Sequence, residues 1–200
     1  LAGWGNRLID WLNSYTFPEE MRLADPDYAA KIAGRYLDIA LSHGTTTMAS
    51  YCTSAPASVT AYFEAAQARG MRVVGGKTCM DRNAPDGLID TAQSAYDDSK
   101  DLIDTWHGRG RLSYAITPRF SPTSTPEQLA ALGGLWQERP DCLMQTHLSE
   151  QTEEFKNYLL SITFALIIIV FSSVHYSFPY LVELFADFPT HPDIRLASID

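Results

Sequence analysis

The feature that most constrains the fold is a regular alternation of helix-like and strand-like segments. Segments with a helical spacing of apolar residues alternate with short runs rich in apolar or β-branched residues, and Gly or Pro separates most of them. Strict alternation predicts parallel strands joined by crossover helices, so the expected fold class is α/β. The expected helices are 4–16, 25–43, 54–70, 89–107 and 125–139, and the expected strands are 45–51, 71–77, 111–117 and 142–147.

Polar groups recur just beyond the predicted strands. They are Cys52-Thr53, the group Asp81-Arg82-Asn83 in an expected loop at 78–87, Arg119-Phe120, and His147 with Glu150. In a barrel of parallel strands the carboxyl ends form one reactive rim, so this recurrence favours a partial TIM-type (β/α) barrel. A doubly wound open sheet is the alternative, but no Gly-x-Gly-x-x-Gly follows a strand.

Proline and capping residues predict where the helices begin and end. Phe17-Pro18 is expected to end the first helix. Asp25 is expected to cap the second helix, with Pro26 in its first turn. Thr125 and Gln128 have the spacing of a capping box. The apolar face of the second helix is predicted to comprise Ile32, Tyr36, Ile39 and Ala40.

Charge and cysteine content exclude some classes of function. The net charge of -9, with no basic patch, argues against nucleic acid as a partner. The 3 cysteines form no Cys-x-x-Cys pair, so neither a zinc knuckle nor a disulfide framework is indicated, and a reducing cytosol fits best. One segment is rich in aspartate, and a solvated helix face is the expected explanation. These residues are Asp86, Asp90, Asp97, Asp98, Asp101 and Asp104.

The most informative short motif is His147 followed by Glu150. The apolar run before it suits a buried strand that delivers His147 to the carboxyl end of the sheet. A neutral imidazole there can bind a metal ion, and a nearby carboxylate can move protons for a water molecule that the metal activates. A hydrogen-bonded structural pair is the alternative.

Several longer words resemble the guanine deaminases, zinc enzymes of the amidohydrolase superfamily. The resemblance covers residues 4–150, about three quarters of the chain. It implies a (β/α) barrel of which about strands 2–5 are present. The matching words are WLNSYTF at 11–17, GTTT at 44–47, MDRNAP at 80–85, TAQSAYDD at 91–98, AITPRF at 115–120 and QTHLSE at 145–150.

The resemblance implies roles for individual residues and for ligands. His147 corresponds to a zinc-binding histidine, and Glu150 to the catalytic glutamate that shuttles protons. Arg119 and Phe120 correspond to the pair that recognises the purine, with Arg119 reading its carbonyl oxygen. An ion pair with a nearby carboxylate is the alternative for Arg119. The implied reaction is the hydrolysis of guanine to xanthine and ammonia, by a cytoplasmic and homodimeric enzyme.

Some of the family's pattern has no counterpart here. The His-x-His pair, a further histidine and a metal-binding aspartate lack matches, so we expect this chain by itself to be an inactive fragment. His43 and His107 fall at helix ends, where a hydrogen-bonding histidine is ordinary. Asp81-Arg82-Asn83 is expected to brace the rim through a salt bridge. A related amidohydrolase acting on another aminated or halogenated heterocycle, or a non-catalytic fragment that pairs with an intact subunit, are the alternative functions.

The two parts of the chain differ in character. Residues 1–150 are expected to form the barrel portion and 151–200 a divergent tail. No Asp, Glu, Lys or Arg occurs from 157 to 182. This apolar stretch is barely long enough for a membrane span, which needs roughly 17–25 residues, and a span is not the favoured explanation. A buried element and a segment that is not native coding sequence are the other two, and the last is favoured.

Overall fold

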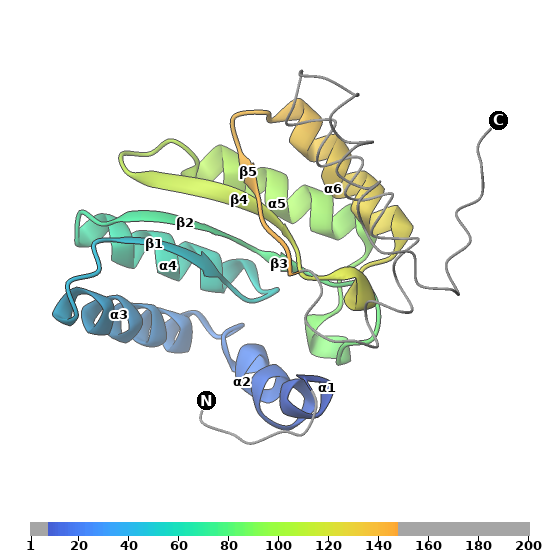
Figure 1. Cartoon of the computed structure of the whole chain (residues 1–200), viewed down its shortest axis with the longest axis horizontal. Coiled ribbons are helices and arrows are strands. Elements are labelled where there is room, and N and C mark those ends of the chain that lie inside the picture. The colour runs from blue at the N-terminus through green and yellow to red at the C-terminus, as the bar shows by residue number, and fades with distance from the viewer. Residues whose placement is uncertain (1–7, 148–200) are drawn as a thin grey trace, which may run out of the picture. The chain divides into compact units, whose positions relative to one another are not determined.

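The computed structural model describes residues 8–147, and these form helices and strands in alternation (Figure 1). The predicted tail at 151–200 lies outside the described residues. The strands are β1 (Thr47–Tyr51), β2 (Arg72–Gly76), β3 (Thr78–Cys79), β4 (Leu112–Pro118) and β5 (Leu143–Met144). The longer helices are α3 (Pro26–Ser42), α4 (Pro56–Ala68), α5 (Ala92–Trp106) and α6 (Pro126–Glu138).

All pairings in this sheet are parallel, and strands close in sequence are neighbours in space. β1 pairs with β2, β2 with β4, and β4 with β5. The short β3, which was predicted as loop, pairs with β4 and extends the path of β2. The prediction of an α/β fold is therefore confirmed, and the sequential strand order is the one that a barrel requires.

Contacts between the first and last strands show that the sheet curves strongly. Three pairing steps separate β1 from β5, which is about 14 Å in a flat sheet at roughly 4.8 Å per step. The Gln145 side chain nevertheless donates to the carbonyl of Ser50 at 3.1 Å and to the hydroxyl of Thr117 at 3.1 Å. The rings of Tyr51 and His147 lie only 4.1 Å apart between centroids. This curvature brings the end of β5 back towards the end of β1.

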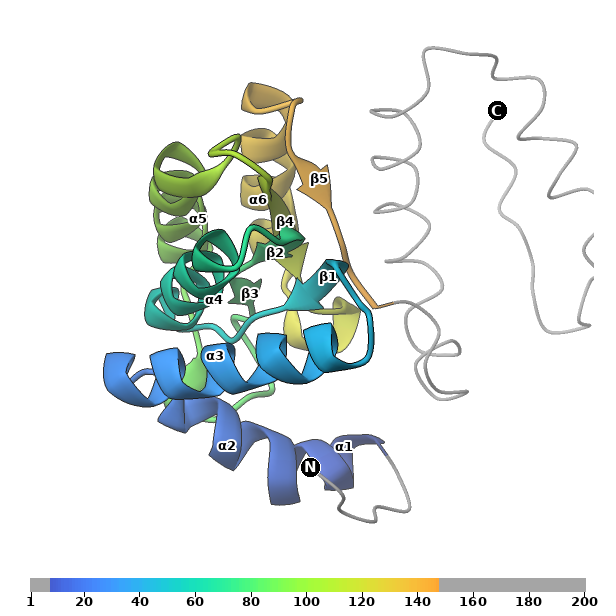
Figure 2. The ribbon, with the colours of Figure 1, turned by 90° about the vertical axis from the view of Figure 1, so that its left-hand side faces the viewer.

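The helices α4, α5 and α6 cover one face of the sheet (Figure 2). Alternate strand residues point into this layer, and each large apolar side chain buried there contributes roughly 1.5–3 kcal/mol. The strand residues in this core include Val73, Leu112, Tyr114 and Ile116, and the helix residues include Val59, Phe63, Ile103 and Leu132.

A buried lysine joins the sheet to the start of α5. Lys77 is fully buried, and its Nζ lies 2.6 Å from Asp90 and 3.6 Å from Asp98. Burial raises the pKa of Asp90, and the Lys77 ammonium opposes that rise. The aspartate-rich segment was predicted to be a solvated face. That holds for most of it but not for Asp90 and Asp98, because the buried ammonium requires partners.

The beginning of the chain differs from its prediction. The first helix does not end at Phe17-Pro18, because α1 (Leu8–Trp11) continues through a π-helical turn, η1 (Leu12–Thr16), into α2 (Phe17–Arg22). Pro18 lies in the first turn of α2, a position where a missing N–H costs little.

The predicted apolar face of α3 is also wrong. Tyr36 and Ile39 are exposed, at 43% and 51%, and the buried residues are instead Ala29, Ala33 and Leu37. The two alanines pack with Ala61 of α4, so the helices approach through small side chains. The predicted cap is confirmed, because the Asp25 carboxylate accepts a hydrogen bond from the backbone N–H of Tyr28 at 2.9 Å.

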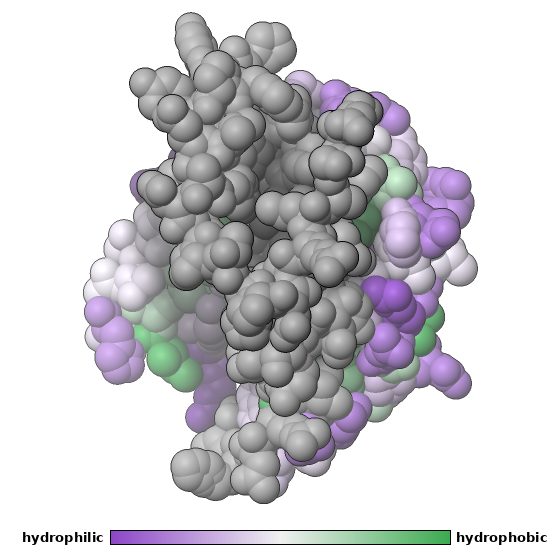
Figure 3. Space-filling model, turned by 45° about the vertical axis from the view of Figure 1, so that its right-hand side comes forward, coloured by the Kyte–Doolittle hydropathy of each residue, from purple (hydrophilic) through white to green (hydrophobic). Residues whose placement is uncertain are grey.

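The described surface carries mostly polar character. In the view of Figure 3, hydrophilic residues and residues of intermediate hydropathy cover most of the coloured area. Among residues 8–147, no helix has both the length and the apolar character needed to cross a bilayer.

The close approach of β2 to β4 generates a prediction. A Cβ added at Gly76 would lie 1.8 Å from the carbonyl oxygen of Ala115, so Gly76→Ala should lower the free energy of unfolding by on the order of 3 kcal/mol. Gly134→Ala in α6 is the matched control, since a Cβ there meets no atom within 4 Å. The control should be neutral or stabilising by up to about 1 kcal/mol. Urea unfolding measures both, and equal stability of the two variants would contradict this packing.

Candidate active site

A cavity of about 370 Å³ lies at the carboxyl ends of the strands. One side is built by residues that follow β1, β2 and β4 and by His147, as the rim prediction requires. The other side comes from α1, η1, α2 and the residue after them, which lie at this end of the sheet in Figure 1. The lining residues are Trp11, Thr16, Glu19, Glu20, Leu23, Tyr51, Cys52, Thr53, Thr78, Arg119 and His147.

The imidazole of His147 is held in one tautomer. Its Nδ1 lies 2.8 Å from the carbonyl oxygen of Arg119. A carbonyl oxygen only accepts hydrogen bonds, so Nδ1 carries the proton and the lone pair of Nε2 is available. Metal-binding histidines are commonly oriented in this way, with the second ring nitrogen donating to a carbonyl or carboxylate. The geometry therefore suits a metal ligand.

The backbone places this imidazole although β5 itself is short. β5 ends at Met144, before the predicted end at His147, and Leu143 is 52% exposed although a buried strand was expected. The hydrogen-bond ladder to β4 nevertheless continues, through the N–H of Gln145 to the carbonyl of Ile116 and the N–H of His147 to that of Arg119, each at 3.0 Å.

The guanidinium of Arg119 lies in the same cavity wall and pairs with Glu20. The distance from Nη1 of Arg119 to Oε2 of Glu20 is 2.8 Å, and both side chains are largely buried. The guanidinium carbon also lies 5.3 Å from the centre of the Phe17 ring. The ion pair that was the alternative explanation for Arg119 thus exists, and it leaves Arg119 on the cavity.

Phe120 occupies a different position from Arg119. It is 3% exposed and packs with Leu12, Phe17, Met80 and Leu88. Among the described residues that line the cavity, Phe120 is not included. Its ring meets that of His147 edge-on, with centroids 6.4 Å apart, so here it supports the imidazole. Its contact with a purine stays a prediction, as does the role of Glu150, which lies outside the described residues.

The group Asp81-Arg82-Asn83 braces the rim, as predicted, but through hydrogen bonds to the loop after β4. The Asp81 carboxylate accepts from the backbone N–H of Thr125 at 2.7 Å and from its hydroxyl. Arg82 donates to the carbonyl of Ser121 and Asn83 to that of Pro122, each at 2.6 Å. Asp81 thereby replaces Gln128 in the predicted capping box, of which only the bond from the N–H of Gln128 to Thr125 forms.

The thiol of Cys52 is unsuited to nucleophilic chemistry although it borders the cavity. Burial raises the pKa of Cys52 to about 12, so the thiol remains protonated at neutral pH. The sequence singled out Cys52-Thr53 as polar rim groups, and the structure assigns them to the wall of the cavity.

A second cluster, His107, Asp141 and Cys142, has the composition of a metal site but not its chemistry. Their potential ligand atoms lie within 4.8 Å of one another. The backbone N–H of Tyr114 donates to Nδ1 of His107 at 3.0 Å, so the neutral ring carries its proton on Nε2, 3.4 Å from Asp141. Burial also raises the pKa of Cys142 to about 11. His107 is therefore a hydrogen-bonding histidine, as predicted.

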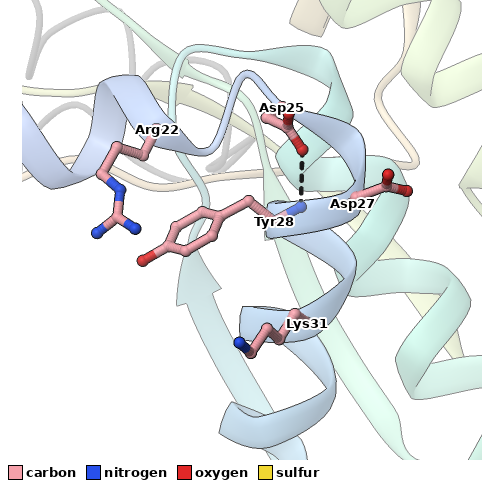
Figure 4. A pocket seen from close by; sticks show the side chains of 5 residues that line it. All are labelled: Arg22, Asp25, Asp27, Tyr28 and Lys31. Atoms are coloured by element: carbon pink, nitrogen blue, oxygen red, sulfur yellow. Dashed lines mark hydrogen bonds between the residues drawn. The ribbon is translucent and has the colours of Figure 1, made fainter.

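A shallow pocket at the start of α3 has no such chemistry either. Figure 4 shows its side chains, with Asp25 capping the helix. The guanidinium of Arg22 lies over the ring of Tyr28, 4.1 Å from its centre, and pairs with Glu19 at 2.8 Å. The lining consists of helix residues alone: Arg22, Asp25, Asp27, Tyr28 and Lys31.

Comparison with known proteins decides the family. The model of the amidohydrolase family matches residues 2–163. This chain belongs to the amidohydrolase family. Guanine deaminase of Escherichia coli is 49% identical over 154 residues, which cover 77% of this chain and 35% of that protein. The chain thus spans little more than a third of the length of the curated relatives that it resembles most.

Solved structures of the family agree with the fold. Guanine deaminase from Bradyrhizobium japonicum has a TM-score of 0.80 and 40% identity, over 86% of this chain and 38% of that one. A guanine deaminase from C. acetobutylicum, solved with bound guanine in the active site, has a TM-score of 0.73 and 32% identity, over 78% of this chain and 38% of that one. The expected partial (β/α) barrel is thereby confirmed.

The brace at the rim of this amidohydrolase is testable. Asp81→Ala removes the acceptor for two hydrogen bonds from Thr125 and should lower the free energy of unfolding by about 1–3 kcal/mol. Asp86→Ala, at an exposed position of the same loop, is the control and should change stability by less than about 0.5 kcal/mol. Urea denaturation of both variants is the measurement, and a neutral Asp81→Ala would show that the brace is dispensable.

Proposed function

We propose that the polypeptide carrying this sequence is a zinc-dependent guanine deaminase, which hydrolyses guanine to xanthine and ammonia. The observation that carries the proposal is that His147 and Arg119 share one cavity and are joined through the carbonyl oxygen of Arg119. The 49% identity to the Escherichia coli guanine deaminase and the likeness to a structure with bound guanine support it.

His147 would hold the zinc ion through Nε2, since its Nδ1–H is occupied by Arg119. A catalytic zinc ion needs three or more protein ligands, so the remaining ligands would come from outside residues 8–147. When bound, the ion would lower the pKa of a water molecule and so supply the nucleophile.

The other site residues would bind the base and move protons. Arg119 would donate hydrogen bonds to the carbonyl oxygen of guanine, in a wall where it is already fixed by Glu20 and Phe17. Glu150 would take a proton from water and deliver it to the ring and to the leaving amine. The cavity volume falls within the range of small-molecule sites, roughly 300–1,000 Å³.

The setting of this activity stays a set of predictions. They are a cytoplasmic location, a homodimer, and a lack of activity of the 200-residue chain by itself. The last can be checked directly by adding zinc to the purified chain and measuring guanine consumption.

The role of Arg119 yields a mutational prediction. In the complete polypeptide that carries this sequence, Arg119→Ala should leave the zinc content unchanged, because His147 contacts the backbone of Arg119 and not its side chain. Turnover of guanine should fall by roughly tenfold or more, because the carbonyl oxygen of the substrate loses a charged donor.

Metal analysis and steady-state kinetics provide the measurement. Arg69→Ala removes an arginine from an exposed ion pair with Asp38 and serves as the control. Unchanged kcat/KM for guanine in a zinc-replete Arg119→Ala variant would remove Arg119 from the substrate site and, with it, the main support for guanine as substrate.

A further inference from the structure

The surroundings of the Arg119 guanidinium come largely from one helix turn. Phe17 and Glu20 lie three residues apart on α2 and therefore on the same helix face. Phe17 presents its ring to the guanidinium, and Glu20 accepts from Nη1 at 2.8 Å. From the opposite side, Sδ of Met80 lies 3.8 Å from the same nitrogen. The guanidinium is thus held on two sides.

The pair keeps hydrogen-bonding capacity in the cavity wall. Among residues 8–147, the Glu20 carboxylate is engaged only through Oε2, and the Arg119 guanidinium donates only through Nη1. Glu20 and Arg119 both line the cavity that contains His147. An acceptor, Oε1 of Glu20, and the donors Nε and Nη2 of Arg119 therefore remain for a ligand.

We propose that Glu20 is a specificity-determining residue of this site, which orients Arg119 and supplies the acceptor beside it. The proposal rests on the proposed function, since it concerns the base that Arg119 would read. The six-membered ring of guanine carries a carbonyl oxygen, which accepts, next to a ring N–H, which donates. A guanidinium beside a carboxylate presents the complementary donor and acceptor. The pair selects a ring with this carbonyl and N–H edge.

A comparison of two substrates tests the proposal in the complete zinc-loaded polypeptide. 2-Aminopurine has the same leaving amino group as guanine but lacks the carbonyl and the adjacent N–H. The readout is the ratio of kcat/KM for guanine to kcat/KM for 2-aminopurine. Glu20→Gln, which keeps the shape of the side chain but loses its charge, should lower this ratio roughly ten- to hundredfold.

Two controls separate recognition from stability. Asp38→Asn breaks a 2.7 Å arginine–carboxylate pair on α3, away from the cavity, and should leave the ratio unchanged. In an Arg119→Ala background, Glu20→Gln should lower the ratio little further, because the two residues act as one unit. A merely structural role for Glu20 would lower turnover of both substrates together and leave the ratio unaltered, which would overturn the proposal.

A substrate variant gives an independent measurement that needs no folded mutant. 1-Methylguanine keeps the carbonyl but has no N–H beside it, so the wild-type protein should use it at least about tenfold less well than guanine. Equal use of the two would overturn the acceptor role of Glu20. Absence of guanine turnover by the zinc-loaded wild type would overturn the proposed function itself. Normal turnover with an unaltered ratio in Glu20→Gln would overturn the role of Glu20 alone.

Discussion

The described part of this chain depends on the hydrogen bonding of β4. This strand pairs with β2, with β3 and with β5, so it is the strand on which the rest of the sheet is assembled. Its residues Leu112, Tyr114 and Ile116 lie in the core under the helices. Because its backbone is held on both sides, the carbonyl that follows it, that of Arg119, has a fixed position. That carbonyl accepts bonds from the N–H and the ring of His147.

The candidate site therefore combines two kinds of support. The ends of parallel strands bring together groups that are distant in sequence, as the Tyr51–His147 ring contact shows. The N-terminal helices then add a second wall, in which Glu20 and Phe17 hold the Arg119 side chain. One residue, Arg119, connects the two, with its backbone on the imidazole and its guanidinium on α2. This arrangement couples the position of a metal ligand to that of a substrate-reading group.

Local signals in the sequence were reliable where their effect is local. The cap at Asp25 and the helix stops at Gly44 and Gly70, both with positive φ, depend on residues within one helical turn. The apolar face of α3 was not predictable in this way. Large side chains such as Ile39 suggested burial, but the helix packs through Ala29 and Ala33, because small residues allow closer approach.

The sequence by itself determined the alternation of elements, hence the parallel sheet, and placed Arg119 and His147 just beyond strand ends. Periodicity and capping act over a few residues, so they can be read without knowing the path of the chain. Only the tertiary structure decided the tautomer of His147, the unsuitability of His107 as a metal ligand, and the partner of Arg119. The Arg119–Glu20 pair joins residues 99 positions apart. Such a pairing has no local signal, because it arises from the curvature of the sheet and the docking of helices at its rim.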